Sequence, residues 1–331
     1  MTHGVRLVGE DGSLDTKGGK LSDFAAFTMP HCHARKTAAC RARRPRRARS
    51  CQADKSGGND KVNNNDKDNF RDKVKVIIDV AKQFRQALSM YVITFANPKG
   101  GAGKTTSAML LAEQIAISGG RVAVLDLDPN ANIMAWAQAR QTEGRDVPFT
   151  VHARPQAEET VDMIDGLSEG VDYLIIDLEG SKDQIVTFAL SRTDLCIIPM
   201  DGSPMEARQA AAAVRLVQTT SNMIRTPISY TLLFTRTNAA FQSTDERDVR
   251  HEMEMNNIPT LPVRIAKRAP YTRIFRDGVL LAELPDLVVT EHEGKGASVT
   301  DKALKQVQSA IENAQDYAQA VIHALTKARA A

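Results

Sequence analysis

Two lysines lie in one glycine-rich stretch, KGGAGKTT, which spans residues 99–106. Three glycines allow the backbone to curl so that successive N–H groups point toward an anion: Gly100, Gly101 and Gly103. The second lysine, Lys104, would bring a positive charge to the β- and γ-phosphates of a nucleotide, and the hydroxyl of Thr105 would bind Mg²⁺. The stretch therefore predicts a nucleotide-binding loop.

This loop departs from the usual phosphate-binding pattern, which is Gly, any four residues, then Gly-Lys-Ser/Thr. The position of the first glycine is occupied by Pro98, and Lys99 follows at once. The additional lysine has no role in the ordinary pattern, so it needs its own explanation.

Carboxylates follow two further apolar segments. Asp126 and Asp128 belong to VLDLDPNAN, and Asp177 ends the apolar run of YLIIDLEG. Because open α/β sheets bind ligands at the carboxyl ends of their strands, these side chains are candidates for magnesium binding and phosphoryl transfer. Glu179 is either a second carboxylate near the γ-phosphate or an acid of the loop, and Asn130 is a candidate cap of the next helix.

Strands and helices alternate from residue 90 onward. The apolar strand 91–96 leads into the loop, a helix is expected over 104–118, and similar strands rich in Val, Ile and Leu follow along the chain. Near-continuous apolar strands separated by helices indicate a parallel sheet covered on both faces. We therefore expect an α/β protein of the P-loop NTPase class, with a doubly wound, mostly parallel sheet.

The first part of the chain has a different composition. Residues 1–68 are polar and basic, which predicts a disordered segment rich in Arg and Asn, and residues 69–89 have the apolar spacing of an amphipathic helix. Met90 opens the first strand, so residues 1–89 are either a genuine arm or an over-extended reading frame. The expected ATPase domain covers 90–300, and a last helix over 301–331 is expected to pack on it.

The loop KGGAGKTT resembles the deviant Walker A loop of the ParA/MinD ATPases, and the resemblance covers roughly residues 90–290. It implies that Lys99 reaches across an ATP-dependent homodimer to the phosphates bound by the other subunit. It also implies that Asp128 orients the attacking water, while Asp126 and Asp177 support the magnesium shell.

The resemblance thus assigns a set of site residues to ATP and Mg²⁺. The catalytic residues would be Lys99, Lys104 and Asp128, and the metal residues Thr105, Asp126 and Asp177. The nucleotide would contact Gly100, Gly101, Ala102, Gly103, Lys104, Thr105, Thr106 and, near the base, Arg236.

A late segment, VRIAKRAPYTRIFRDG, concentrates positive charge with no acid before Asp277. Its cations are candidates for sequence-independent DNA binding driven by counterion release: Arg264, Lys267, Arg268, Arg273 and Arg276. The alternative is a solvated face, or arginines that pair with acids of the same domain.

The resemblance implies a weak ATPase that is stimulated by a ParB-like or other partner and that partitions a plasmid, a chromosome or another cargo. Close alternatives are an accessory ATPase of conjugative DNA transfer and a MinD-like, membrane-associated positioning ATPase. The apolar face of the last helix consists mainly of Ala, Val and Leu, which favours packing over membrane binding. With only four cysteines, the chain has no disulfide framework, so a cytoplasmic protein is expected. The resemblance further implies association with the nucleoid.

Overall fold

The computed structural model describes residues 90–180, 184–293 and 297–330; the predicted disordered segment 1–68 and the predicted helix 69–89 lie outside this part. Its centre is a sheet of seven parallel strands in the order β3-β2-β4-β1-β5-β6-β7. The strands are β1 (Tyr91–Phe95), β2 (Val122–Asp126), β3 (Thr150–Ala153), β4 (Tyr173–Asp177), β5 (Leu195–Met200), β6 (Ser229–Thr237) and β7 (Thr260–Ala266). The predicted fold class is confirmed.

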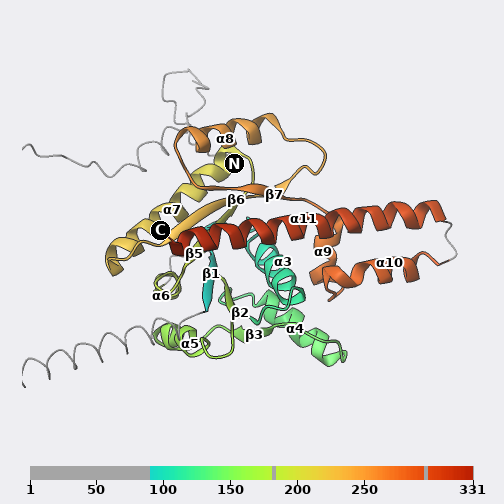
Figure 1. Cartoon of the computed structure of the whole chain (residues 1–331), viewed down its shortest axis with the longest axis horizontal. Coiled ribbons are helices and arrows are strands. Elements are labelled where there is room, and N and C mark those ends of the chain that lie inside the picture. Colours follow the sequence, from blue (N-terminus) through green and yellow to red (C-terminus); the bar gives the residue numbers. More distant parts are fainter. Residues whose placement is uncertain (1–89, 181–183, 294–296, 331) are drawn as a thin grey trace, which may run out of the picture.

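Helices cover both faces of this sheet (Figure 1). On one face pack α3 (Lys104–Ile117), α4 (Asn132–Thr142), α9 (Ala269–Arg276), η2 (Leu281–Glu283), α10 (Leu284–Glu291) and α11 (Ala297–Ala330). On the other face pack α5 (Thr160–Gly166), α6 (Gln184–Leu190), α7 (Pro204–Ile224) and α8 (Thr244–Met255), and η1 (Ala157–Glu159) precedes α5.

Alternating side chains of each strand enter the two cores. In β1, Ile93 and Phe95 belong to the core that contains α3 and α11, whereas Val92 belongs to the core that contains α7. This two-sided burial explains why the strands are almost entirely apolar, since a strand residue on either face meets a helix.

The strand order places three predicted motifs side by side. β4 lies between β1 and β2, and β1 in turn lies between β4 and β5. Within the register, Asp177 is opposite both Phe95 of β1 and Asp126 of β2. The segments that follow β1, β2 and β4 therefore meet at one carboxyl edge of the sheet, where open α/β folds bind ligands.

Several elements were missed or only partly predicted from the sequence. The helices α6, α9 and α10 had not been expected, and α11 begins at Ala297, before residue 301. In α9, Tyr271 and Ile274 are buried on one side of the helix, and the arginines lie between and after them in the sequence. The high content of basic residues made this helical spacing hard to recognise.

The sequence Ser243-Thr244-Asp245-Glu246 has the pattern of a capping box, and at the start of α8 this box is formed only in part. The Ser243 hydroxyl accepts a hydrogen bond from the Glu246 N–H at 3.1 Å, as expected for an N-cap. The carboxylate of Glu246, however, is buried and forms an ion pair with Arg264 at 3.2 Å. The Glu246 carboxylate thus pairs with Arg264, which is distant in sequence, instead of with the backbone N–H of Ser243.

The long helix α11 crosses the sheet and packs against β7, α3 and α10 (Figure 1). Its buried positions include Val307, Ala314, Val321 and Leu325, which belong to the expected apolar face of Ala, Val and Leu. Among the described residues, no helix has an apolar stretch long enough to span a bilayer.

Candidate nucleotide-binding site

The glycine-rich loop joins β1 to α3 with the geometry that its sequence predicts. Gly101 and Gly103 have φ angles of 78° and 92°, a left-handed conformation that a side chain would strain. Helix α3 begins at Lys104 directly after the loop. The amino end of α3 therefore adds its partial positive charge to an anion held by the loop.

Lys104 is buried at the base of this loop. Its Nζ donates hydrogen bonds to the carbonyl oxygens of Asn97 at 3.0 Å and Lys99 at 3.1 Å. Burial lowers the pKa of Lys104, although the charges of Asp177, Asp128 and Glu179 oppose this effect. The loop thus fixes the ammonium group at the floor of the site, close to several carboxylates.

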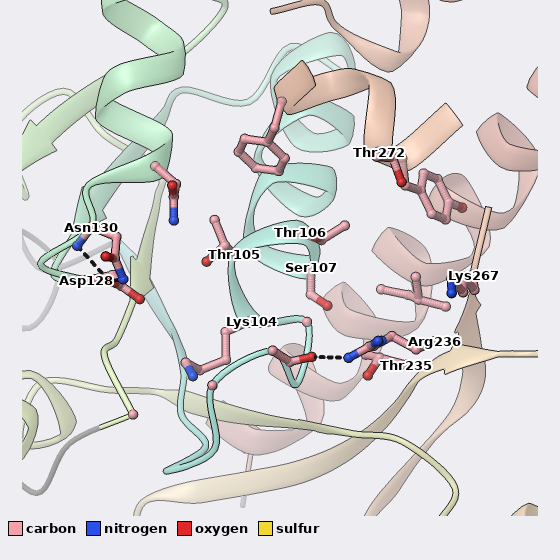
Figure 2. A pocket seen from close by; sticks show the side chains of 18 of the residues that line it. Lys104, Thr105, Thr106, Ser107, Asp128, Asn130, Thr235, Arg236, Lys267 and Thr272 are labelled. Carbon is pink, nitrogen blue, oxygen red and sulfur yellow. Dashed lines mark hydrogen bonds between the residues drawn. The ribbon is translucent and has the colours of Figure 1, made fainter. Parts of the chain in front are cut away.

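A pocket of about 880 Å³ opens above the loop. Figure 2 shows Lys104 and Asp128 on one side of it, and Lys267 and Thr272 on the other. Most of the predicted nucleotide-binding residues line this pocket: Gly100, Gly101, Gly103, Lys104, Thr105, Thr106 and Arg236. The side chain of Ala102 is instead buried below the loop.

Strand β6 braces the loop from the side. The Thr235 hydroxyl lies 2.7 Å from the Ala102 carbonyl oxygen, and Arg236 Nη1 donates to the Gly101 carbonyl at 2.8 Å (Figure 2). Arg236 has a φ of 56°, and the pairing of β6 with β7 shifts register beside it. This strained backbone directs the Arg236 guanidinium toward the loop. The sequence predicted that Arg236 lies near the nucleotide base, but it did not predict this contact with the loop.

Asp126 connects the end of β2 to helix α4. Its Oδ2 accepts hydrogen bonds from the N–H groups of Ile133 and Met134, both at 3.0 Å, and so caps α4. Its other oxygen, Oδ1, is buried and has no hydrogen-bond partner in the part of the chain that the structure describes. Burial raises the pKa of Asp126.

Asp177 lies beside Asp126, at the end of β4. Neither of its carboxylate oxygens accepts a hydrogen bond of good geometry, and both are buried. Burial raises the pKa of Asp177 to about 7, and the nearby Thr105 hydroxyl and Lys104 ammonium act in the opposite direction.

Three buried carboxylate oxygens thus lack a hydrogen-bond partner among residues 90–180, 184–293 and 297–330, and they lie on two neighbouring strand ends, on Asp126 and Asp177. Buried polar atoms without partners are costly, and carboxylate oxygens are ligands that Mg²⁺ prefers, directly or through its water shell. The residues present therefore fit magnesium. No cluster of three or more His, Cys, Asp or Glu side chains that could hold a metal ion occurs in the described residues.

Asp128 lines the pocket and is oriented by a near neighbour. Its Oδ1 accepts hydrogen bonds from the backbone N–H of Asn130 at 2.9 Å and from the Asn130 amide at 2.8 Å (Figure 2). Asn130 was a candidate for the N-cap of α4. The N-cap residue is instead Ala131, whose side chain forms no capping hydrogen bond.

Lys99 does not line the pocket of its own chain. Its ammonium forms an ion pair with Glu206 at the start of α7, and the Lys99 side chain remains 41% exposed while that of Glu206 is 3% exposed. The two lysines of the loop therefore lie in different surroundings, one inside the pocket and one outside it.

The five predicted DNA-contacting residues are not brought together as an open basic patch. Arg264 pairs with Glu246, Arg273 with Asp277 and Glu291, and Arg276 with Asp277. The remaining two, Lys267 and Arg268, line the nucleotide pocket. Acids of the same chain, including Asp277 at the end of the segment, therefore neutralise much of its positive charge.

Three pocket residues on α9 were missed from the sequence: Tyr271, Thr272 and Phe275. Their spacing at i, i+1 and i+4 is that of one side of a helix, and this signal could have identified them. In Figure 2, Thr272 lies on the side of the pocket opposite Lys104 and Asp128.

Comparisons with known proteins agree with this geometry. The family model described as VirC1 protein matches residues 90–327. A protein named ParA from Rhizobium radiobacter is 29% identical over 241 residues, which are 72% of this chain and 99% of that protein. The protein virC1 of the same organism is 26% identical over 195 residues, 58% of this chain and 83% of that protein.

Among solved structures, apo McdA from Cyanothece has a TM-score of 0.51 and 19% identity, covering 67% of this chain and 99% of that one. At this identity the likeness supports the fold. The resemblance predicted from the glycine-rich loop is confirmed by the family model and by the ParA relative. The chain belongs to the VirC1 protein family and is a P-loop ATPase of the ParA/MinD type.

Proposed function

We propose that this ParA-like partition ATPase is a switch that ATP turns on by joining two copies of the chain. In this scheme the ATP-bound dimer binds DNA without sequence preference, and a ParB-like or other partner stimulates a weak hydrolysis that releases it. The protein would act in the cytoplasm, on the nucleoid. The cargo would be a plasmid, a chromosome or another large assembly.

The observation that carries this proposal is the different placement of the two loop lysines. Lys104 is buried in the pocket of its own chain, whereas Lys99 lies outside that pocket and is 41% exposed. A lysine that its own phosphate site does not use is available to the site of a second copy. Two phosphate chains enclosed between two subunits would attract one such lysine from each side.

The residues of one chain would bind ATP as follows. The loop N–H groups and Lys104 hold the β- and γ-phosphates, and Thr235 and Arg236 keep the loop in shape through the Ala102 and Gly101 carbonyls. Mg²⁺, when bound near Thr105, Asp126 and Asp177, would compensate phosphate charge. Asp128, fixed by Asn130, would orient the attacking water.

Light scattering tests the dimer. The protein is measured with Mg²⁺ and a non-hydrolysable ATP analogue, and its mass is expected to double relative to the protein with ADP. Lys99→Ala should bind the analogue but remain monomeric, because the contact to the second phosphate chain is lost. The ion pair with Glu206 is lost as well, so a thermal melt checks that the variant is folded. Lys302→Ala, at an exposed lysine of α11, is the matched control and should dimerise normally.

A chain that binds the analogue but stays monomeric would contradict the switch. If Lys99→Ala dimerised as well as the control, the role of Lys99 would be wrong, even if ATP still joined the subunits.

DNA binding is proposed for the segment 264–276, with Lys267 as its main candidate because it is exposed and forms no ion pair with another described residue. Retention on duplex DNA should require ATP and fall steeply with salt, since each phosphate contact releases counterions. Lys267→Ala should weaken retention, with analogue binding measured in parallel because Lys267 also lines the pocket. If retention of the protein on DNA depended on neither salt concentration nor nucleotide, this would contradict the proposal.

A further inference from the structure

A second carboxylate lies at the phosphate end of the pocket. Glu179 follows Asp177 by two residues and lines the same pocket as Lys104 and Asp128. Its negative charge is among those that act on the buried Lys104 ammonium. Because Lys104 would hold the β- and γ-phosphates, Glu179 lies near the place that the terminal phosphate would occupy.

Arg154, which follows β3, holds this carboxylate. Its Nη1 lies 3.1 Å from Glu179 Oε2 and also donates to the Leu127 carbonyl at 2.9 Å. Leu127 directly precedes Asp128. One guanidinium therefore ties Glu179 to the backbone of the segment that carries Asp128. The two side chains are 28% and 33% exposed, so the pair is partly shielded from solvent.

The backbone after Glu179 is pressed against the start of the glycine-rich loop. A Cβ atom added at Gly180 would lie 2.5 Å from the Pro98 carbonyl oxygen, which is closer than real contacts allow. The absence of a side chain at Gly180 thus lets the segment 178–180 approach the loop. Contacts on both sides, Arg154 and the Pro98 carbonyl, define where the Glu179 carboxylate lies.

We propose that Glu179 is a further catalytic residue for ATP hydrolysis and that Arg154 is its positioning residue. The inference rests on the ATPase function proposed above. In the reaction, the water oxygen forms a bond to the γ-phosphorus while the bond from that phosphorus to the β–γ bridging oxygen breaks. ADP leaves with the electron pair, and the water proton is lost to the phosphate product or to solvent.

A water molecule has two hydrogens, and a single carboxylate fixes only one of them. With Asp128 and Glu179 on the same pocket, each hydrogen has an acceptor, so the water oxygen is turned toward phosphorus. Arg154 keeps the Glu179 carboxylate in place and offsets its charge, which would otherwise repel the phosphates. Positioning and charge compensation are the main contributions that phosphoryl transfer requires from a protein.

Steady-state ATPase assays with separate measurement of ATP-analogue binding test the pair. Glu179→Gln keeps the shape but loses the charge, and kcat should fall about tenfold or more because the attacking water is less well oriented, while analogue affinity changes by less than about twofold. Arg154→Gln should lower kcat in the same way. The double variant should be no slower than the slower single variant, because the two residues act as one unit.

Glu179→Asp, which retains the charge on a shorter side chain, should recover part of the lost kcat. Asp165→Asn is the matched control: Asp165 pairs with Arg192 at 2.8 Å, lies away from the pocket and should leave kcat unchanged. A thermal melt of each variant identifies any that fail to fold.

Normal kcat in folded Glu179→Gln would overturn the proposal, as would fully additive effects of the two changes. Equal losses of analogue affinity and kcat would also overturn it, since they would mean a binding or structural role. If the unchanged protein neither binds nor hydrolyses ATP, the ATPase function itself fails, an outcome that the binding assay distinguishes.

Discussion

At the scale of single residues, burial and two hydrogen bonds fix the position of the Lys104 side chain. It is 6% exposed and bonded to two loop carbonyls in a pocket that also contains carboxylates. Lys104→Ala should reduce the affinity for a fluorescent ATP analogue by at least about a hundredfold, because a charge-assisted phosphate contact in a partly buried site is lost, with ~3 kcal/mol as the expected order. Normal turnover by this variant would show that the loop is not the phosphate site.

The brace from β6 to the loop offers a second test. Thr235→Val removes the hydroxyl that bonds the Ala102 carbonyl and leaves that carbonyl unsatisfied, so stability should fall by about 1–3 kcal/mol. ATP affinity should fall with it, because the loop loses a support. Thr237→Val is the matched control, since the buried Thr237 hydroxyl has no hydrogen-bond partner among the described residues and its loss should be neutral or stabilising.

Urea unfolding and analogue titration measure both effects. Equal stabilities of the Thr235→Val and Thr237→Val variants would contradict the importance of this brace.

Sequence reasoning found the residues whose chemistry lies within one short motif. Lys104, Thr105 and Asp177 are examples, because a phosphate loop and a strand-end aspartate have local patterns. It did not find Arg154 as the partner of Glu179, or Glu206 as the partner of Lys99. These contacts join segments that are distant along the chain, and only the strand order brings them together.

At the scale of elements, η2 is held by charged groups from two helices. Glu113 of α3 accepts hydrogen bonds from the N–H groups of Leu281 and Ala282, at 3.0 and 2.9 Å. Arg140 of α4 forms two bonds to the Glu283 carboxylate, at 2.8 and 2.7 Å. The short helix thereby connects the nucleotide-binding helix α3 to α9 and α10.

The pKa of Glu113 gives this connection a pH dependence. Burial raises the pKa from 4.5 to about 7, and Glu283 adds to the rise, whereas the two backbone N–H groups and Arg140 lower it. Between these two values the folded state binds more protons than the unfolded chain, so stability falls as pH rises from 4.5 to about 7. The loss is on the order of 3 kcal/mol.

Glu113→Gln should remove this dependence, because the amide does not titrate. Urea unfolding at several pH values from 4.5 to 8 should show the unchanged protein losing more stability with rising pH than the variant. Parallel curves for the two proteins would contradict the raised pKa. The difference between the curves isolates Glu113 from other titrating groups.

The strands were predicted more completely than the helices. Each buried parallel strand is a short apolar run, which is visible in sequence. Helices such as α9 and α10 are short and amphipathic, and the residues that bury them come from α11 and η2. Their local pattern alone is weak, and the arginines of α9 suggested a surface instead.

At the scale of the whole molecule, α11 is part of the core on one face of the sheet. Leu325 is 1% exposed, and Leu325→Ala should destabilise the protein by about 2–5 kcal/mol through lost burial and a remaining cavity. Gln319→Ala, at an exposed position of the same helix, should change little. Chemical unfolding measures both, and equal stabilities would mean that the helix does not pack as described.

Because this apolar face is already buried against the sheet, it is not available to a lipid surface while the domain is folded. Flotation with anionic vesicles should therefore leave the folded protein at the bottom of the gradient, with or without ATP. Comigration with vesicles would instead favour the MinD-like alternative.

The end of α11 also reaches the beginning of the central strand. Arg329 donates to the Met90 carbonyl at 2.6 Å and lies over the Tyr91 ring at 4.0 Å. Since β1 runs from this point toward the glycine-rich loop, residues 90 and 329 lie together at the edge of the sheet opposite the pocket. A fluorescent reporter attached before residue 90 or after residue 329 would be connected to the side of the domain opposite the pocket. Such fusions should allow live imaging without obstructing nucleotide entry.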